Sequence, residues 1–203
     1  MFHPTKIIAI GLNYLDHAKE MKHEIPDYPL IFLKPPTTVI HNGDSIVYPS
    51  MTKELHYEGE LAVIIKNKIK NVTRDDAPGY IAGYTCANDI TARDLQRIDG
   101  QWTRSKSFDT FCPLGPKSVS KIDPSNLAIS TKVNGVVKQQ SNTKNMIFGV
   151  YELVSYISGI MTLFPGDVII TGTPPGVGQI NIGDVVEVEI EGIGILKNTV
   201  ISG

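Results

Sequence analysis

Cysteine is scarce in this chain of 203 residues, and its two copies form no pattern. Cys86 and Cys112 lie far apart, and nothing near them resembles a CxxC or zinc-binding spacing. We expect two reduced, buried thiols. The chain also lacks a signal-peptide pattern and any apolar run long enough to span a membrane, because the apolar stretch 7–12 is short and interrupted by Gly11. We therefore expect a cytoplasmic protein with no membrane partner.

An excess of positive charge is absent as well. The 19 lysines and arginines are balanced by 21 acids, the formal net charge is −2, and the lysines are scattered along the chain. This excludes a basic surface for nucleic acid. Internal repeats, low-complexity segments and breaks in composition are also missing. With 41% hydrophobic residues, the chain can bury one substantial core, and we predict a single domain over residues 1–203.

Apolar and turn residues follow one another in a way that predicts many strands and few helices. We expect strands at residues 6–10, 30–34, 46–48, 61–65, 81–87, 128–133, 136–139 and 168–171. Asn134 and Gly135 form a two-residue hairpin signal between two of these strands. The fold class that follows is α+β and rich in strands.

Four segments are predicted to be helical or turn-like. Residues 14–21 form a short helix and belong to a mobile lid at 14–29, which contains two prolines. Residues 75–80 form a short helix or turn. A further helix opens with Thr91 as N-cap and Asp94 three residues later. The longest helix covers residues 146–160, where apolar side chains recur at spacings of three and four.

Two acids directly precede an apolar strand. Glu58 and Glu60 are separated by Gly59, and alternate side chains of a strand point to the same side. Residues 61–65 form a continuous apolar run, typical of a strand covered on both faces, where unpaired charges are strongly unfavourable. Asp89, at the end of the next apolar run, supplies a third carboxylate. Carboxylates alone favour Mg2+, Mn2+ or Ca2+ over zinc.

The alternative is that these acids are ordinary solvated charges, with Asp89 capping a helix. The chain contains such acids for comparison. In residues 184–191 three glutamates alternate strictly with branched apolar residues, which is typical of a half-buried strand with one wet face. We interpret those glutamates as structural. Glu58 and Glu60 differ because the run that follows them has no polar residue.

Two pairs of polar residues share helix faces. His17 and Glu20 are three residues apart on the predicted helix 14–21, which suits an acid–base pair but also an ordinary surface pair. Arg93 and Gln96 share a face just beyond Asp89. A guanidinium there can bind a substrate carboxylate or form a plain surface ion pair.

Lys106 and Thr173 are further candidates. Lys106 lies between Trp102 and Phe108 and can stabilise a developing enolate, although lone lysines are usually solvated. Residues 172–178 are rich in glycine and proline but lack the Gly-Lys-Ser/Thr ending of a phosphate loop, and their prolines remove amide donors. We reject nucleotide binding and retain Thr173 as a side chain that the turn presents to a site.

Seven motifs follow one another along almost the whole chain. They are Gly11-Leu12-Asn13-Tyr14 with His17 and Glu20, Phe32-x-Lys34-Pro35, His56-x-Glu58-x-Glu60-Leu61, Asn88-Asp89-Ile90-Thr91-Ala92-Arg93-Asp94-Leu95-Gln96, Trp102-Thr103-x-x-Lys106, Lys132-Val133-Asn134-Gly135 and Thr171-Gly172-Thr173-Pro174-x-Gly176-Val177-Gly178. Together they resemble the fumarylacetoacetate hydrolase family. The likeness is to its short members, which include acylpyruvate hydrolases and oxaloacetate decarboxylases, rather than to the members with an added N-terminal domain.

The resemblance implies a β-rich catalytic domain, described as a mixed β-sandwich roll with few short helices, in a homodimer. It implies Mg2+ or Mn2+ held by Glu58, Glu60 and Asp89. His17 and Glu20 match the lid dyad that activates water. The positions that surround a bound 2-oxo acid are matched by Arg93, Gln96, Lys106 and Thr173.

The function implied is metal-dependent cleavage of a C–C bond in acylpyruvate-like 2-oxo acids. Acylpyruvate hydrolysis and oxaloacetate decarboxylation both leave a pyruvate enolate, held by the metal and Lys106. Residues 99–111 also resemble members that act as 2-hydroxyhepta-2,4-diene-1,7-dioate isomerase or 5-oxopent-3-ene-1,2,5-tricarboxylate decarboxylase, and the sequence does not separate these activities. A non-catalytic 2-oxo acid binding module is the third alternative. The intact set of candidate residues argues against it.

Overall fold

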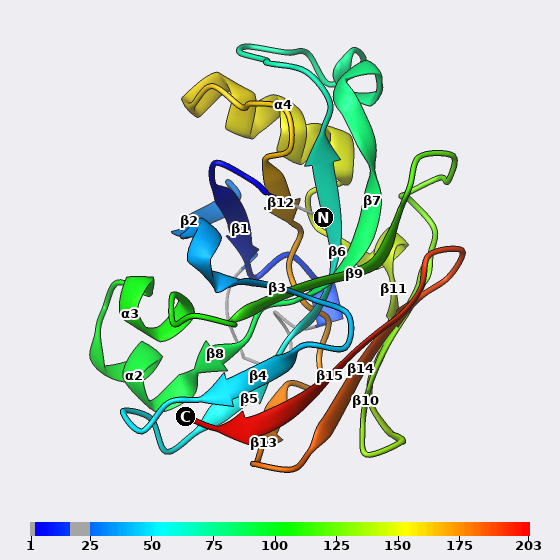
Figure 1. Cartoon of the computed structure of the whole chain (residues 1–203). Helices are drawn as coiled ribbons and strands as arrows, with labels where there is room; N and C mark the ends of the chain where they lie inside the picture. Colours follow the sequence, from blue (N-terminus) through cyan, green and yellow to red (C-terminus); the bar gives the residue numbers. More distant parts are fainter. Residues whose placement is uncertain (1–2, 17–24) are drawn as a thin grey trace.

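Three β-sheets form most of the molecule, and short helices lie at their margins (Figure 1). The computed structural model describes residues 3–16 and 25–203. Residues 17–24 of the predicted lid, with His17 and Glu20, lie outside this part, so the lid and its dyad stay predictions. No helix in the described part is long and apolar enough to cross a membrane.

The largest sheet has seven strands in the order β2-β1-β12-β6-β7-β9-β3. Their bounds are Leu30–Lys34 (β2), Ile7–Gly11 (β1), Val168–Ile170 (β12), Gly59–Ile65 (β6), Ile81–Asn88 (β7), Cys112–Val119 (β9) and Val39–His41 (β3). Strand β1 runs parallel to β12, and β3 runs parallel to β9. The other neighbours are antiparallel, so the sheet is mixed.

The two smaller sheets complete the β-structure. One has five strands in the order β11-β10-β14-β15-β4, with bounds Val136–Asn142 (β11), Ala128–Val133 (β10), Val185–Ile190 (β14), Gly194–Ser202 (β15) and Ser45–Tyr48 (β4). The other has three, in the order β13-β5-β8, with bounds Gly178–Ile180 (β13), Leu55–Tyr57 (β5) and Thr91–Ala92 (β8). Only Glu58 separates β5 from β6, so this residue lies at the junction of two sheets.

The helices are few and short. The α-helices are Arg93–Ile98 (α2), Thr103–Lys106 (α3) and Val150–Ile160 (α4), and the 3-10 helices are Pro36–Thr38 (η1), Ala77–Tyr80 (η2) and Thr143–Asn145 (η3). Figure 1 shows α4 at one end of the seven-stranded sheet, and α2 and α3 together at the other end near β8. The charged residues on α2 and α3 are therefore remote from α4.

Strand β6 is buried along its whole length because both faces of its sheet are covered. Leu61 and Val63 belong to a cluster with Val154 of α4 and Val188 of the five-stranded sheet. Ala62 points to the opposite face, into a second cluster with Ile170. The continuous apolar run was predicted to be covered on both faces, and this prediction is confirmed.

Several local predictions are confirmed. The strand at Leu30–Lys34 has the expected bounds, and Asn134 and Gly135 turn between β10 and β11. Cys86 and Cys112 are free and buried. Strand β14 alternates between buried and half-buried residues along Val185–Ile190, as the strictly alternating glutamates predicted.

Two helix starts were predicted wrongly. Thr91 lies in β8 and caps nothing; the helix begins at Arg93, and the Thr91 hydroxyl donates to Asp89 O at 2.9 Å. The long helix begins at Val150 rather than 146, because Met146 is engaged in a bridge with Tyr14. In both cases a tertiary contact outweighs the local signal.

Candidate active site

Three carboxylates meet where β6 begins. Glu58 and Glu60 flank Gly59, the first residue of β6, and Asp89 follows the last residue of β7. The register pairs Gly59 with Asn88, and Asp89 N donates to Glu58 O at 2.8 Å. Ligand atoms of the three carboxylates lie within 4.8 Å of one another, and all three residues are buried. Strand pairing thus brings together the three residues that the sequence singled out as metal ligands.

Glu60 is the least favourably placed of the three acids. Burial raises the pKa of Glu60 well above its ordinary value, and the negative charges of Asp89 and Glu58 raise it further. Gly172 N donates to Glu60 Oε2 at 2.6 Å and opposes the shift. A carboxyl in such a place holds a proton unless another cation replaces it. The buried, all-oxygen set fits a hard divalent cation, which Glu58, Glu60 and Asp89 would hold.

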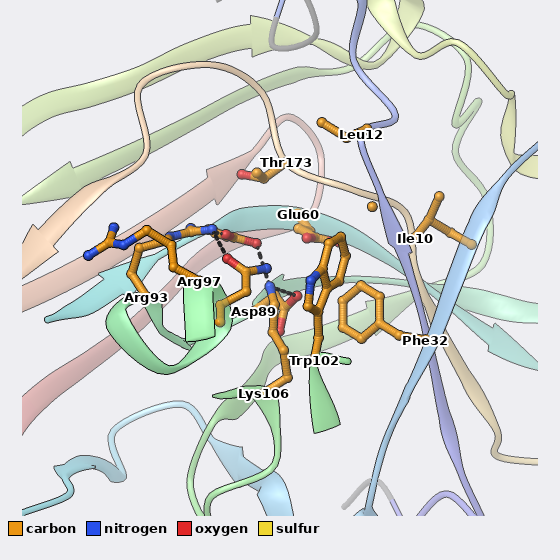
Figure 2. Close-up of a pocket in the computed structure, with 13 residues that line it drawn as sticks. Ile10, Leu12, Phe32, Glu60, Asp89, Arg93, Arg97, Trp102, Lys106 and Thr173 are labelled. Carbon is orange, nitrogen blue, oxygen red and sulfur yellow. Dashed lines mark hydrogen bonds and ion pairs between the residues drawn. The ribbon is translucent and has the colours of Figure 1, made fainter. Parts of the chain in front are cut away.

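Three basic side chains surround the carboxylates. Lys106 Nζ donates to Asp89 Oδ2 at 2.6 Å and to Glu58 Oε2 at 2.9 Å. Lys34 Nζ pairs with Asp89, and Arg93 Nη2 pairs with Glu58. Lys106 is only 2% exposed, so the alternative of a solvated lysine is wrong here. The site alternates acids and bases in a closely packed cluster (Figure 2).

These ion pairs set the charge states of the cluster. Burial opposes the ionisation of Glu58, but Lys106 and Arg93 outweigh it and lower the pKa of Glu58 to about 2. Burial also opposes the charge on Lys106, yet Asp89 and Glu58 raise the pKa of Lys106 above its ordinary value. Lys106 is therefore a charged hydrogen-bond donor, suited to stabilising an oxyanion rather than to accepting a proton.

Helix α2 presents Arg93 and Gln96 to the same cavity, as their spacing predicted. Arg93 Nη1 donates to Gln96 Oε1. The Arg93 side chain is 16% exposed and pairs with the candidate metal ligand Glu58, so it is not a surface ion pair. Arg97, one turn farther along α2, also lines the cavity while it pairs with Glu54.

Thr173 reaches the site through a buried hydrogen-bond network. Its hydroxyl donates to Gly59 O at 3.0 Å and accepts from Gln139 Nε2 at 2.8 Å. Gln139 Oε1 accepts from Gly59 N at 3.0 Å, which closes the ring. Gln139 Nε2 also donates to Pro174 O at 2.8 Å. One side chain from β11 thus connects Gly59, which lies between Glu58 and Glu60, to the turn after β12.

The carboxylates open into a cavity of about 220 Å³. Its charged side is formed by the carboxylates and by the basic residues of α2 and α3. Its apolar side is formed by Ile10, Leu12, Phe32 and Trp102. Figure 2 shows the arginines at one side of the carboxylates, with Phe32 and Ile10 at the other.

The structure adds residues that the sequence reasoning did not single out as site residues. Lys34 is 1% exposed and was recognised only as part of a family motif; a lysine at the end of an apolar strand was the available signal. Gln139 lies in a polar stretch of β11 and gives no such signal. Asn13 donates to Thr171 O at 2.7 Å and to Phe148 O at 3.0 Å, and so holds the strand that leads to Thr173.

The sequence profile described as "Fumarylacetoacetate (FAA) hydrolase C-terminal" matches residues 6–201. The chain belongs to the fumarylacetoacetate hydrolase family. This membership confirms the family that the seven motifs predicted. Proteins with this fold also confirm the predicted β-rich α+β class. The buried carboxylates at the start of β6 and just after β7 are thus the candidate site of a fumarylacetoacetate hydrolase family member.

Similar sequences come from archaea and from mammals. A protein of Methanocaldococcus jannaschii described as uncharacterized is 64% identical over 197 residues, which cover 97% of this chain and 83% of that protein. The mitochondrial oxaloacetate tautomerase Fahd2a of Rattus norvegicus is 44% identical over 209 residues, which cover 98% of this chain and 67% of the relative.

A solved structure is similar over the whole chain. The 5-carboxymethyl-2-hydroxymuconate delta-isomerase from Mycobacterium smegmatis has a TM-score of 0.94 and 48% identity, and the match covers 100% of this chain and 80% of that one. Of the proteins named here, the rat relative is described as a tautomerase and the Mycobacterium smegmatis protein as an isomerase. The family membership therefore indicates an enzyme without fixing its reaction.

Proposed function

We propose that this protein is a divalent-metal-dependent enzyme that interconverts the enol and keto forms of a small 2-oxo dicarboxylic acid of the oxaloacetate class. The observation that carries the proposal is the buried triad Glu58, Glu60 and Asp89, with Lys106 between two of its members. A cation held by this triad would supply a Lewis acid that polarises the carbonyl of a chelated 2-oxo acid.

The charges of the site favour a doubly negative substrate. The three carboxylates face an equal number of basic groups, which are Lys34, Lys106 and Arg93. In their ionised forms these six groups sum to zero. A divalent cation then leaves a net charge of +2, which a dianion neutralises and a monoanion does not. A 2-oxo dicarboxylate therefore fits the site better than a 2-oxo monocarboxylate.

Lys106 and Arg93 have distinct parts in the proposed reaction. Removal of a proton from the carbon next to the carbonyl places negative charge on the 2-oxo oxygen, and the charged Lys106 lies beside the carboxylates where that oxygen would bind. Arg93 and Gln96 of α2 face the same cavity and offer planar donors to a substrate carboxylate. The base expected from the family resemblance is the pair His17 and Glu20, outside the described residues.

The related enzymes support this choice of reaction. The rat mitochondrial relative is named an oxaloacetate tautomerase, and the Mycobacterium smegmatis structure is named a delta-isomerase. Both names describe proton movement next to a carbonyl group. Neither reaction requires an attacking water.

A second candidate function is cleavage, by acylpyruvate hydrolysis or oxaloacetate decarboxylation. The presence of both His17 and Glu20 in the sequence favours it, because hydrolysis needs a base that activates water. Loss of CO2 from oxaloacetate leaves the enolate of pyruvate, whereas the proposed tautomerisation passes through the enolate of oxaloacetate itself. Both place negative charge on the 2-oxo oxygen, so one site can support both reactions. The isomerase of ring-cleavage products remains an alternative on the same chemistry.

One experiment separates these functions. Freshly dissolved enol oxaloacetate is given to the purified protein with Mg2+ or Mn2+, and the enol absorbance and pyruvate release are followed together; acetylpyruvate is tested in parallel. Loss of the enol faster than pyruvate appears supports tautomerisation. Pyruvate release at the rate of enol loss supports cleavage. If neither enol loss nor pyruvate release exceeds the rate with metal alone, the proposal is wrong.

A further inference from the structure

A second, larger cavity lies behind the candidate active site. It has a volume of about 800 Å³ and is lined by parts of β2 and of the segment around α3, including Leu30, Leu33 and Pro35. The smaller cavity beside the carboxylates has about 220 Å³. The two share only Phe32 and Trp102 among the described residues that line them.

The two shared side chains form a continuous aromatic wall. The rings of Phe32 and Trp102 meet edge to face, with centroids 5.2 Å apart and planes at 76°. Such a contact is favourable for two aromatic rings. Both residues are only partly buried, as expected for side chains that face a cavity. Figure 2 shows the two rings side by side next to Lys106.

The backbone of β1 makes room for this wall. A Cβ atom at Gly11 would lie 2.9 Å from Cζ3 of Trp102, a distance that real Cβ atoms essentially never show. The absence of a side chain at Gly11 therefore lets the indole sit against β1. Lys106 Nζ lies 5.1 Å from the Phe32 ring centroid, so the wall also contacts the ammonium group beside the carboxylates.

We propose that Trp102, supported by Phe32, limits the length of the chain that can extend from the 2-oxo acid group of a bound ligand, and so restricts the site to short 2-oxo acids. The proposal rests on the proposed 2-oxo acid function, in which the carboxylates fix one end of the ligand. On the apolar side of the small cavity, an alkyl chain attached to the bound 2-oxo acid group would contact the Trp102 indole. Removal of the indole joins the small cavity to the large one, whose lining is mostly apolar.

This wall explains how one fold can select short substrates. On this proposal the intact protein binds small 2-oxo acids and excludes those with long alkyl tails, whereas a protein without the indole binds both. Each additional methylene group buried in the joined cavity improves affinity by a factor of about four. The selectivity for tail length is thus a property of one side chain rather than of the charged cluster.

The test compares Trp102→Ala with the parent protein, both loaded with Mn2+, by calorimetric binding of unbranched 2-oxo acids. Oxalate chelates the cation without reaching the wall and serves as the reference ligand. We expect equal oxalate affinity in both proteins. For 2-oxooctanoate relative to 2-oxobutanoate, we expect the affinity ratio to rise by about tenfold or more in the variant. Trp102→Leu keeps an apolar side chain, so its affinity ratio should rise less.

Leu33→Ala is the matched control, because Leu33 lines only the large cavity and leaves the wall intact. Its affinity ratio should equal that of the parent. An unchanged ratio in both Trp102 variants, with normal oxalate binding, overturns the proposal. Loss of oxalate binding in both variants makes Trp102 part of the charged site and also overturns it. Absence of oxalate binding in the parent contradicts the proposed function itself, and the size limit falls with it.

Discussion

At the scale of single residues, the site depends on how burial and neighbouring charges divide the acids. Glu58 has two basic partners and stays ionised. For Glu60, burial and the negative charges of Asp89 and Glu58 outweigh the attraction of nearby positive charge. Asp89 is held between Lys34 and Lys106. The carboxylate without a compensating base is the one for which a metal ion makes the largest difference.

The first prediction concerns the pH dependence of stability in metal-free protein. The raised pKa of Glu60 means that the folded state binds this proton more tightly than the unfolded chain does. The stabilisation of the folded state by this proton is complete below the ordinary glutamate pKa of about 4.3. It is lost as the pH rises through the raised pKa of Glu60. The melting temperature of metal-free protein should fall over this interval. Differential scanning calorimetry checks this.

Mn2+ and Glu60→Gln provide the comparison. Bound Mn2+ replaces the proton, so it should remove most of the decline and should raise the melting temperature more at high pH. Glu60→Gln has no proton to lose at this position, so its metal-free melting curve should be flatter than that of the parent. Parallel curves for the parent and Glu60→Gln would show that Glu60 is not the titrating group.

The second prediction concerns Lys106. Its ammonium contacts two of the three carboxylates, and Lys106→Met removes a donor aimed at developing negative charge. We expect kcat for oxaloacetate to fall by about 10²- to 10³-fold. Mn2+ affinity should persist, because the carboxylates remain. Lys106→Arg keeps the charge and should retain more activity. Equal losses in Mn2+ affinity and kcat would indicate a purely structural lysine.

At the scale of elements, the site is formed where strands end. The β6–β7 pairing positions Glu58, Glu60 and Asp89, and the turn after β12 supplies Gly172 N and Thr173. The sequence could predict these ends, because apolar runs and their polar boundaries are local signals. It could not predict that Gln139 of β11 joins them, because that contact bridges two sheets.

The third prediction tests the close approach of those sheets. A Cβ atom on Gly59 would lie 2.1 Å from Thr131 Oγ1 of β10. Gly59→Ala should therefore destabilise the fold by about 1–3 kcal/mol and displace the carboxylates. Thr131→Ala removes the obstructing hydroxyl, which has no hydrogen-bond partner among the described residues. The double variant should recover much of the stability in urea unfolding. No recovery would contradict this steric account.

The fourth prediction concerns the start of β12. Asp167 is fully buried and accepts hydrogen bonds from Thr5 N, Lys6 Nζ and Phe164 N, which attach the segment before β1 to β12. In Asp167→Asn one carboxylate oxygen becomes an amide NH2 group, which cannot accept hydrogen bonds from the donors that face it. We expect a loss of about 2–3 kcal/mol in the free energy of unfolding near neutral pH.

The pH dependence of this effect has a definite sign. Burial opposes ionisation of Asp167, but the hydrogen bonds from Lys6, Phe164 and Thr5 lower the pKa of Asp167 below its ordinary value. Its stabilisation is therefore present above the ordinary aspartate pKa of about 3.9 and is lost as the pH falls through the lowered value. The difference between parent and variant should shrink in acid. A constant difference would contradict the assignment to the charge.

At the scale of the whole molecule, both faces of the seven-stranded sheet are covered, and its central strand carries the acids into the interior. The β-rich class and both hairpin strands follow from alternating and continuous apolar patterns. The starts of two helices do not, because Thr91 pairs in a sheet and Met146 bridges to Tyr14. The burial of Lys34 could not be predicted from the sequence either, because it depends on the ion pair with Asp89.

If the three buried carboxylates hold the metal, turnover depends on them and on the bound ion together. The most direct measurement is the rate of enol oxaloacetate conversion by chelator-treated protein as Mn2+ is added back, for the parent and for Glu60→Gln. We expect the activity of the parent to rise with Mn2+ and to saturate at one ion per chain, and we expect almost no activity in Glu60→Gln. Full activity in the chelator-treated parent, or undiminished activity in Glu60→Gln, would show that turnover does not depend on a metal held by these carboxylates.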